Sequence, residues 1–376
     1  VEWGVIEWPP KDRRTVAVIY QRPMGGKFVR GLSETRKPID PMDAKDTIVA
    51  PLYSALRELA SRNVVHRAIR PDNLYYLDES CTQIVIGDCT TTPPAYDQHA
   101  LFETISSAMT PPAGRGRGDF RNDMYSFGST LMFMIAGRNP ASTLDENAII
   151  DQKIAESSFK VLVGENSLND TMLELLRGLL SDEAKDRWNL EKLDLWVSGR
   201  RMTPGQMTRS RKAKQPFEFA GKKFTQKRSL ARAIGANWDA ALKIAREGVI
   251  EVWLRHSLED KDTAERIGSA VRDATADEVN KGMDDNILLS RICMLLDPTG
   301  PIRFRNFIAM PDGFGTVVES DPAMAQPFSE IIRKELVRYW TEAQPEYLPD
   351  HTIQLETARN LEKYLRQPTM GSGIER

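Results

Sequence analysis

The side chains with the clearest chemical potential stand close together early in the chain. The sequence there runs His66-Arg67-Ala68-Ile69-Arg70-Pro71-Asp72-Asn73, and a further carboxylate follows at Asp88. Imidazole, guanidinium, amide and carboxylate groups are the side chains that exchange protons, donate to anions or offer oxygen ligands. The third residue of the run is Ala68, however, and its methyl group can neither accept a proton nor hold a metal ion.

Four short motifs, in the order in which they occur, resemble those of protein kinases. Residues 66–73 resemble the catalytic loop H-R-D-x-K-P-x-N, and residues 83–90 resemble a short strand followed by D-F-G. Residues 123–128 are similar to the D-x-Y-S-x-G opening of the long buried helix in the large kinase lobe. Residues 176–188 resemble the L-L-x-x-D-P-x-x-R-W segment near the end of that fold. The ordered set covers roughly the first half of the chain.

The resemblance implies a kinase frame that has lost its catalytic base. In kinases the aspartate of the catalytic loop orients the attacking hydroxyl and accepts its proton. Ala68 stands at that position, so the loop of His66, Arg67, Ala68 and Arg70 is expected to be degenerate. Arg70 matches a lysine that contacts the transferred phosphate, and it keeps the positive charge. His66 and Asp123 match residues that are structural in active kinases.

Two side chains match the metal-holding positions of the family. Asn73 corresponds to the asparagine of the catalytic loop, and Asp88 corresponds to the aspartate of D-F-G. One interpretation is a vestigial magnesium site that serves a nucleotide. The other is that both side chains remain as hydrogen-bonding struts, and we favour it because the base is gone. No G-x-G-x-x-G or V-A-x-K motif occurs in the chain, so the phosphate-gripping residues of the family are also missing.

A hinge is expected early in the chain. Residues 3–8 and 15–20 resemble the last two strands of a small kinase lobe, joined by a turn at residues 9–12. A vestigial nucleotide site would then lie at Gln21, Arg22, Pro23 and Met24. Pro23 aligns with a residue whose N–H donates to adenine, and proline has no N–H. An alignment shifted by one residue would restore the donor. We expect no tight binding of ATP, with or without magnesium.

The segment after Asp88 also departs from the kinase pattern. Residues 110–118 stand where A-P-E and the loop after it would lie. The glutamate of A-P-E pairs with an arginine that matches Arg187, and this chain has no acid at that place. We therefore expect Arg187 to find another partner or to be solvated.

Local patterns predict the elements that hold these residues. Apolar side chains at helical spacing from Asp46 predict a helix before the loop. Val64-Val65 and residues 74–77 are β-prone runs that would form a small hairpin around it. The apolar run of residues 131–136 continues the long helix, and Gly137 is placed to cap its end.

The second half carries no motif with readable chemistry. Residues 217–224 predict a hairpin with an Ala-Gly turn, and Ser229 is placed to cap a helix from Leu230. Further helices are expected at residues 263–275, 287–296, 327–340 and 352–365. Core positions are expected for Trp238, Trp253 and Trp340. The pattern is similar to helical modules appended to bacterial kinase-like proteins.

A basic stretch separates the two halves. From Arg200 to Lys214 the chain has arginines and lysines but no acid, together with Pro204 and Gly205. This composition is typical of a linker. Contact with nucleic acid or an anionic membrane is the alternative, and we give it low weight because no aromatic residues are interleaved. The predicted organisation is a kinase-like domain lacking most of the small lobe (1–198), a linker (199–214) and a mainly helical domain (215–376).

Composition sets the outer bounds. The chain has 376 residues, 41% of them hydrophobic and 28% charged, which is typical of a soluble globular protein of two domains. A net charge of −2 gives no overall field that favours nucleic acid. The cysteines lack metal-ligand spacing, which indicates a reducing compartment. No apolar stretch approaches the ~20 residues of a membrane-spanning helix. We expect a cytoplasmic protein.

These patterns predict a mainly α (α+β) fold with a short hairpin and hinge, a kinase-like large lobe and a helical C-terminal domain. The predicted function is a pseudokinase, without phosphoryl transfer, that acts as a scaffold or regulatory subunit. The apolar strands around Val5, Ile6, Trp8 and Ile19 are expected to meet a protein partner or a second copy. The alternative is a divergent kinase-fold enzyme that uses nucleotide and metal at Asn73 and Asp88.

Overall fold

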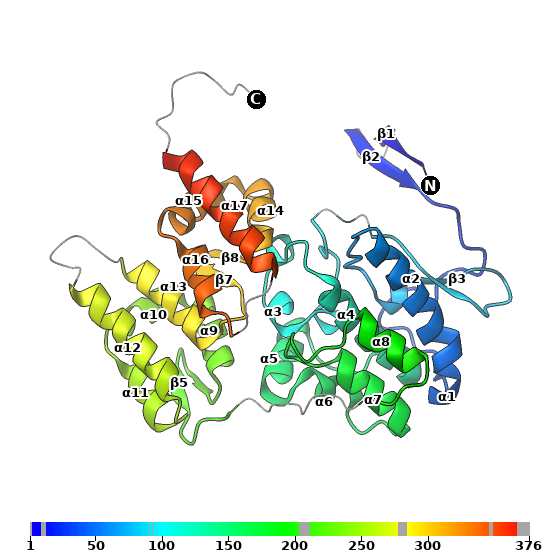
Figure 1. Cartoon of the computed structure of the whole chain (residues 1–376), viewed down its shortest axis with the longest axis horizontal. Helices are drawn as coiled ribbons and strands as arrows, with labels where there is room; N and C mark the ends of the chain where they lie inside the picture. Colours follow the sequence, from blue (N-terminus) through cyan, green and yellow to red (C-terminus); the bar gives the residue numbers. More distant parts are fainter. Residues whose placement is uncertain are drawn as a thin grey trace.

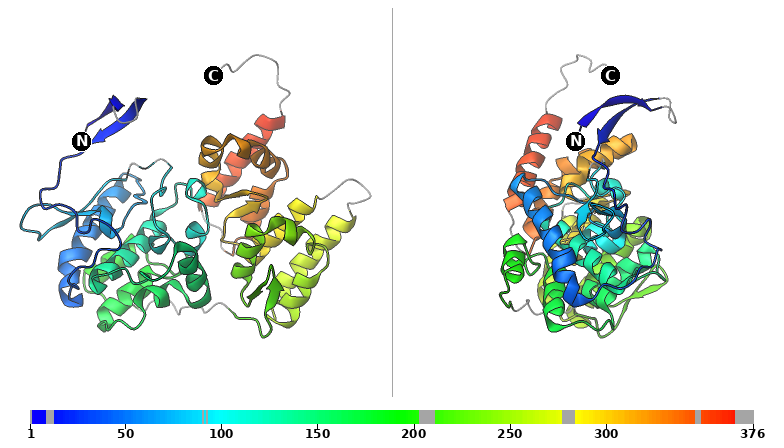
Figure 2. Two further views of the ribbon diagram at one scale, coloured as in Figure 1. Left: turned by 180° about the vertical axis from the view of Figure 1, so that it is seen from behind. Right: turned by 90° about the vertical axis from the view of Figure 1, so that its right-hand side faces the viewer.

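The computed structural model describes residues 2–8, 13–89, 91, 93–202, 211–276, 284–345 and 349–366. Within these residues the chain is mainly α-helical, and its strands form four separate two-stranded sheets. This confirms the mainly α (α+β) class predicted from the sequence. Figures 1 and 2 show the early elements (blue to green) packed beside the later ones (yellow to red).

The N-terminal unit, residues 2–202, is helical apart from two antiparallel hairpins. Its elements are β1 (Glu2–Trp8), β2 (Arg13–Ile19), α1 (Pro41–Ala44), α2 (Ala50–Ser61), β3 (Leu74–Tyr76), β4 (Ile84–Ile86), α3 (Ile105–Ala108), α4 (Phe120–Ala136), α5 (Glu146–Glu156), α6 (Ser158–Val163), α7 (Asp170–Leu179) and α8 (Leu190–Val197). One apolar core, from Phe28 to Trp196, joins most of these elements, a smaller one lies between α3 and α5, and neither includes a residue of β1 or β2.

The central helix of this core is α4, which is buried from Asp123 to Ile135. Its first turn is fixed by a capping box between Asp119 and Asn122. It ends at Gly137, whose φ of 67° is the left-handed conformation that glycine adopts most readily. The predicted long buried helix and its glycine cap are confirmed.

The approach to the loop of residues 66–73 differs in part from prediction. The helix expected from Asp46 is confirmed, as α1, a π-helical turn (Lys45–Val49) and α2 follow one another directly. After α2, Asn63 takes a positive φ of 54° and the N–H of Val64 donates back to the carbonyl oxygen of Leu59. These contacts close the helix end, so the strand predicted at Val64-Val65 is wrong, and β3 pairs with β4 instead.

The β1–β2 hairpin stands apart from the packed helices (Figure 1). In its register Val5 lies opposite Val16, and Trp3 lies opposite Val18. Six of its apolar side chains are exposed, with exposed fractions from 40% for Ile6 to 78% for Trp3. A lone two-stranded hairpin is marginally stable in water, because it has no layer to pack against. The predicted turn at residues 9–12 lies outside the described residues.

The C-terminal unit, residues 211–366, packs helices around two more hairpins. Its elements are β5 (Phe217–Phe219), β6 (Lys222–Phe224), α9 (Lys227–Ala236), α10 (Trp238–Leu242), α11 (Val249–His256), α12 (Lys261–Ala276), α13 (Asp285–Leu296), β7 (Ile302–Phe304), β8 (Phe307–Ala309), α14 (Phe314–Ser320), α15 (Ala325–Arg333), α16 (Leu336–Ala343) and α17 (Pro349–Arg366). Two apolar cores hold it, and the three predicted tryptophans are buried in them.

Two predicted boundaries in this unit are wrong. α9 begins at Lys227 with Gln226 as its N-cap residue, so Ser229 lies inside the helix and does not cap it. The helix predicted over residues 327–340 is two helices, α15 and α16, because Glu335 between them takes a left-handed φ of 54°. No helix in the described part of the chain combines the length and apolar character needed to cross a membrane.

Candidate functional site

One buried carboxylate, that of Asp123, holds the backbone of the loop of residues 66–73. Asp123 of α4 accepts the N–H of His66 at 2.7 Å and the N–H of Arg67 at 2.8 Å. These two bonds hold Arg67 at a positive φ of 58°, a conformation that a residue with a side chain seldom adopts. Burial raises the pKa of Asp123 to about 6, because the charged carboxylate loses water. The carboxylate therefore serves the loop backbone, as the resemblance implied.

The neutral imidazole of His66 bonds backbone groups on the inner side of the loop. His66 is buried, and burial lowers its pKa to about 4. Its Nδ1 accepts the N–H of Ala68 at 3.2 Å, so Nε2 carries the proton and donates to the carbonyl oxygen of Gly87 at 3.3 Å. Both ring nitrogens bond the backbone. Ala68 itself is 2% exposed, so a buried methyl group stands at the position that the motif resemblance assigns to the base.

The Asn73 amide ties the loop to the segment after β4. Its Nδ2 donates to the carbonyl oxygens of Ala68 at 2.9 Å and Asp88 at 2.7 Å. Its Oδ1 lies against Gly87, where an added Cβ would come within 2.3 Å. The side chain is therefore enclosed by backbone on both sides, which is the arrangement of a structural strut.

The Asp88 carboxylate is exposed and accepts the hydroxyl of Tyr20 at 2.8 Å. Tyr20 follows β2, so this bond joins the end of the hairpin to the end of the loop region. Among the described residues no group of three or more histidine, cysteine, aspartate or glutamate side chains gathers as metal ligands do. With the Asn73 amide enclosed and Asp88 bonded to Tyr20, the donor set fits a magnesium–nucleotide complex poorly.

The hinge residues offer little to an adenine ring. Pro23 has no N–H, and the N–H of the next residue, Met24, donates to the carbonyl oxygen of Leu77 at 3.0 Å. A shift of one residue toward the C-terminus therefore meets an amide that is already in use. Gln21 and Arg22 are exposed.

The cations of the loop have partners of their own. Arg70 pairs with Asp72 at 2.9 Å, which offsets the charge that a phosphate would meet. Arg67 is 2% exposed and lies 3.4 Å from the carboxylate of Glu103, which is 1% exposed. The Arg67 guanidinium also donates to the hydroxyl of Ser107 at 3.1 Å. Glu103 was not singled out from the sequence, because its role depends on a fold contact far along the chain.

Arg187, expected to lack an acidic partner, is buried and bonds backbone instead. Its guanidinium donates to the carbonyl oxygens of Ser181 at 2.9 Å and Arg121 at 3.3 Å. The same group lies 5.5 Å from the centre of the Tyr125 ring. Lys153, also missed from the sequence, is fully buried and donates to three carbonyl oxygens of residues 100–103. Burial lowers the pKa of Lys153 to about 7.

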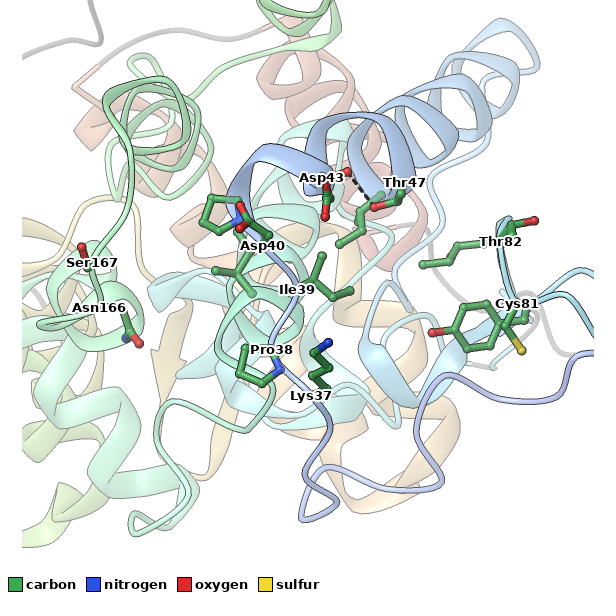
Figure 3. A pocket seen from close by; sticks show the side chains of 15 residues that line it. Lys37, Pro38, Ile39, Asp40, Asp43, Thr47, Cys81, Thr82, Asn166 and Ser167 are labelled. Carbon is green, nitrogen blue, oxygen red and sulfur yellow. Dashed lines mark hydrogen bonds between the residues drawn. The ribbon is translucent and has the colours of Figure 1, made fainter.

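Two clefts lie away from the metal-like positions. One, of about 900 Å³, runs between residues 37–48 and 81–84 (Figure 3). Among the side chains that line it, the hydroxyl of Thr47 donates to the backbone oxygen of Asp43. A second cleft, of about 670 Å³, is lined by Arg70 and Asp72 of the loop and by Arg232 and Ile308 of the C-terminal unit.

Comparison with known proteins gives partial similarity to protein kinases. No protein-family model matches the chain. It is 24% identical to calcium-dependent protein kinase 5 of Plasmodium falciparum over 152 residues, which cover 39% of this chain and 26% of that protein. It is 27% identical to serine/threonine-protein kinase D of Synechocystis over 124 residues, 30% of this chain and 24% of that protein.

The calcium and calcium/calmodulin-dependent serine/threonine-protein kinase of Pisum sativum is 23% identical over 168 residues, 43% of this chain and 32% of that protein. The chain thus spans about a quarter to a third of the length of these relatives. The similarity is weak and partial, and it supports a place for the chain in the kinase-like superfamily.

Proposed function

We propose that this protein is a pseudokinase that acts as a protein–protein scaffold or regulatory subunit without phosphoryl transfer. The observation that carries the proposal is the state of the loop. A buried methyl group, Ala68, stands at the position that the motif resemblance assigns to a base, and the polar groups of His66 and Asn73 bond the backbone. Phosphoryl transfer relies on positioned charge and a positioned nucleophile, and this loop offers neither.

The nucleotide side of the site supports the same proposal. Pro23 removes one hinge donor, and the amide of Met24 is bonded within the protein. Asn73 works as a strut between Ala68 and Asp88. A nucleotide would have to break these bonds to gain its own, which lowers its net binding free energy.

The proposed partner surface is the β1–β2 hairpin. Trp3, Val5, Trp8, Val16 and Ile19 are all between 45% and 78% exposed. Apolar side chains gathered in this way on a folded protein indicate an interaction site. Either a second copy of the chain or another protein of the same compartment, which we propose to be the cytoplasm, would cover the hairpin.

A divergent kinase-fold enzyme is the second candidate, and the exposure of Asp88 favours it. A carboxylate open to solvent can exchange its Tyr20 partner for a metal ion. Loss of the base alone costs about 10²–10⁴-fold in rate, which leaves room for slow turnover. A third candidate, an adaptor that docks on nucleic acid or membrane through the basic linker, has low weight, and residues 203–210 of that linker lie outside the described part.

The test is to restore the missing carboxylate. Ala68→Asp should leave the protein folded and produce no transfer of radiolabel from ATP to a generic protein substrate, because positioning and charge supply most of the catalysis. The wild-type chain is measured alongside. Activity gained by Ala68→Asp would mean that the rest of the site is competent, and activity of the wild type would favour the enzyme.

A further inference from the structure

The two units meet backbone to backbone at glycines. We call residues 110–118 of the N-terminal unit the docking segment. It contacts residues 308–316 of the C-terminal unit, which we call the docking turn. The N–H of Met310 donates to the carbonyl oxygen of Gly114, and the N–H of Gly118 donates to the Asp312 carboxylate, both at 2.9 Å. The hydroxyl of Thr316 adds a bond to the carbonyl oxygen of Ala113 at 2.6 Å.

The backbones of the two units lie so close together here that only glycine fits on either side of the contact. A Cβ on Gly114 would stand 2.6 Å from the carbonyl oxygen of Ile308, and a Cβ on Gly313 would stand 2.2 Å from the carbonyl oxygen of Gly114. Both obstacles are backbone atoms, which cannot swing aside as a side chain can. A residue with a side chain at either position would force the units apart.

Side chains extend the contact beyond the glycines. Arg232 of α9 forms an ion pair with Asp151 of α5 and donates to Asn147 at 2.7 Å. Arg303 of β7 is 2% exposed, and its guanidinium lies 3.6 Å from the sulfur of Met109. A buried cation at the junction indicates that the units are packed and not merely adjacent.

A chain of hydrogen bonds runs from the docking segment to the loop. Arg115, buried within that segment, donates to the carbonyl oxygens of Ala95 at 2.9 Å and Gln98 at 2.5 Å. The Gln98 side chain, 3% exposed, then donates to the carbonyl oxygen of Ile69 at 3.1 Å and accepts from the Arg70 guanidinium at 3.4 Å. The groups from Arg115 to Ile69 are buried, whereas Arg70 is partly exposed and also pairs with Asp72.

We propose that docking of the C-terminal unit on residues 110–118 holds the loop of residues 66–73 in its observed conformation, through Arg115 and Gln98. The C-terminal unit is then an internal partner of the loop, and its release changes the loop. This inference is independent of whether the loop transfers phosphate.

Hydrogen exchange in the full chain tests the proposal at single amides. The N–H groups of Met310 and Gly118 bond across the junction and report docking. The N–H of Arg67 bonds the Asp123 carboxylate of α4, and that of Asn73 bonds the carbonyl oxygen of Arg70, so both report the loop. The variant is Gly313→Ala. The matched control is Gly315→Ala, two residues along, where an added Cβ meets nothing within 4 Å.

We expect Gly313→Ala to speed exchange at both pairs of amides by about tenfold or more, while amides within α4 and α13 keep their protection. Gly315→Ala should leave all of them unchanged. Gln98→Leu should speed the loop amides alone, since the docking bonds do not involve its side chain. If Gly313→Ala unfolds the C-terminal unit, Asp312→Ala takes its place, because that side chain bonds the N–H of Gly118. Met310 alone then reports docking, since Gly118 has lost its acceptor.

Two results would overturn the proposal. In one, the docking amides exchange faster while the loop amides keep wild-type rates, which would mean that the loop holds itself. In the other, the docking amides of the variant remain as protected as in the wild type, which would mean that the glycine contact does not hold the units together.

Discussion

The loop of residues 66–73 and the β1–β2 hairpin use their side chains in opposite ways. The loop has the polar residues of a reactive site, yet His66, Arg67 and Asn73 are buried and bonded within the protein. The hairpin has the apolar residues of a core, yet Trp3 and Val16 are 78% and 68% exposed. Residue type alone would assign chemistry to the first and packing to the second. The loop residues have internal partners and the hairpin side chains are exposed, and on this difference we base the proposed structural role of the loop and the proposed partner contact of the hairpin.

The largest effect is expected from the carboxylate that holds the loop. Asp123→Asn places an amide N–H₂ beside the N–H of His66 or Arg67, so one buried donor loses its acceptor. The free energy of unfolding should fall by about 3–4 kcal/mol, measured by chemical denaturation. Asp170→Asn, on the exposed first turn of α7, is the control and should cost about 0.5 kcal/mol or less. Equal small losses would show that the loop does not depend on Asp123.

Acid should weaken the loop through His66. Burial lowers its pKa to about 4 in the folded protein, whereas an unfolded histidine has a pKa of about 6.5. Its neutral form therefore stabilises the fold fully above pH 6.5, and this contribution is lost as the pH falls toward 4. Between pH 7 and 4.5 the loss should be about 2.5 kcal/mol.

His66→Gln, which lacks the titrating group, provides the comparison. Asp123 titrates with the opposite sign in this range, because its folded pKa is raised to about 6. It is present in both proteins, so the difference between their stability–pH curves isolates His66. Parallel curves would contradict the buried neutral imidazole.

The hairpin should show the reverse: its side chains should contribute little to the free energy of unfolding and much to the contact with a partner. Trp8→Glu and Ile19→Glu place charges on side chains that are 45% and 60% exposed, so unfolding free energies should change by about 0.5 kcal/mol or less. Light scattering across a concentration series and partner pull-down should both lose signal. Val252→Glu, at a 57% exposed position on α11, is the control and should leave both unchanged. A monomer at every concentration, with unaltered pull-down, would remove the hairpin as a partner surface.

The sequence predicted the features that depend on neighbouring residues and missed the contacts between distant segments. The loop motif, α4 and the cap at Gly137 follow from short-range spacing, so they could be placed without a structure. Val64-Val65 failed because a bond from Val64 back to Leu59 closes the preceding helix, which strand propensity does not reveal. The break at Glu335 had no glycine or proline to mark it.

The candidate site shows the same limit. Its positions could be aligned from the motif, but the partners of those positions come from distant segments. Glu103 beside Arg67 and Tyr20 on Asp88 are fold contacts with no signal in the sequence. The glycines of residues 110–118 indicated only a loop, and the docked C-terminal unit gives them a reason.

Direct titration with ATP, with and without magnesium, tests the central claim that the loop is a structural element. The prediction is no saturable heat and no thermal stabilisation, because the hinge amide of Met24 and the Asn73 amide are bonded internally. A true ligand at 100 times its Kd would add about 2.7 kcal/mol, which is easily measured. A magnesium-dependent stabilisation of that size, abolished by Asp88→Ala and kept by the exposed control Glu79→Ala, would contradict the account and favour the enzyme.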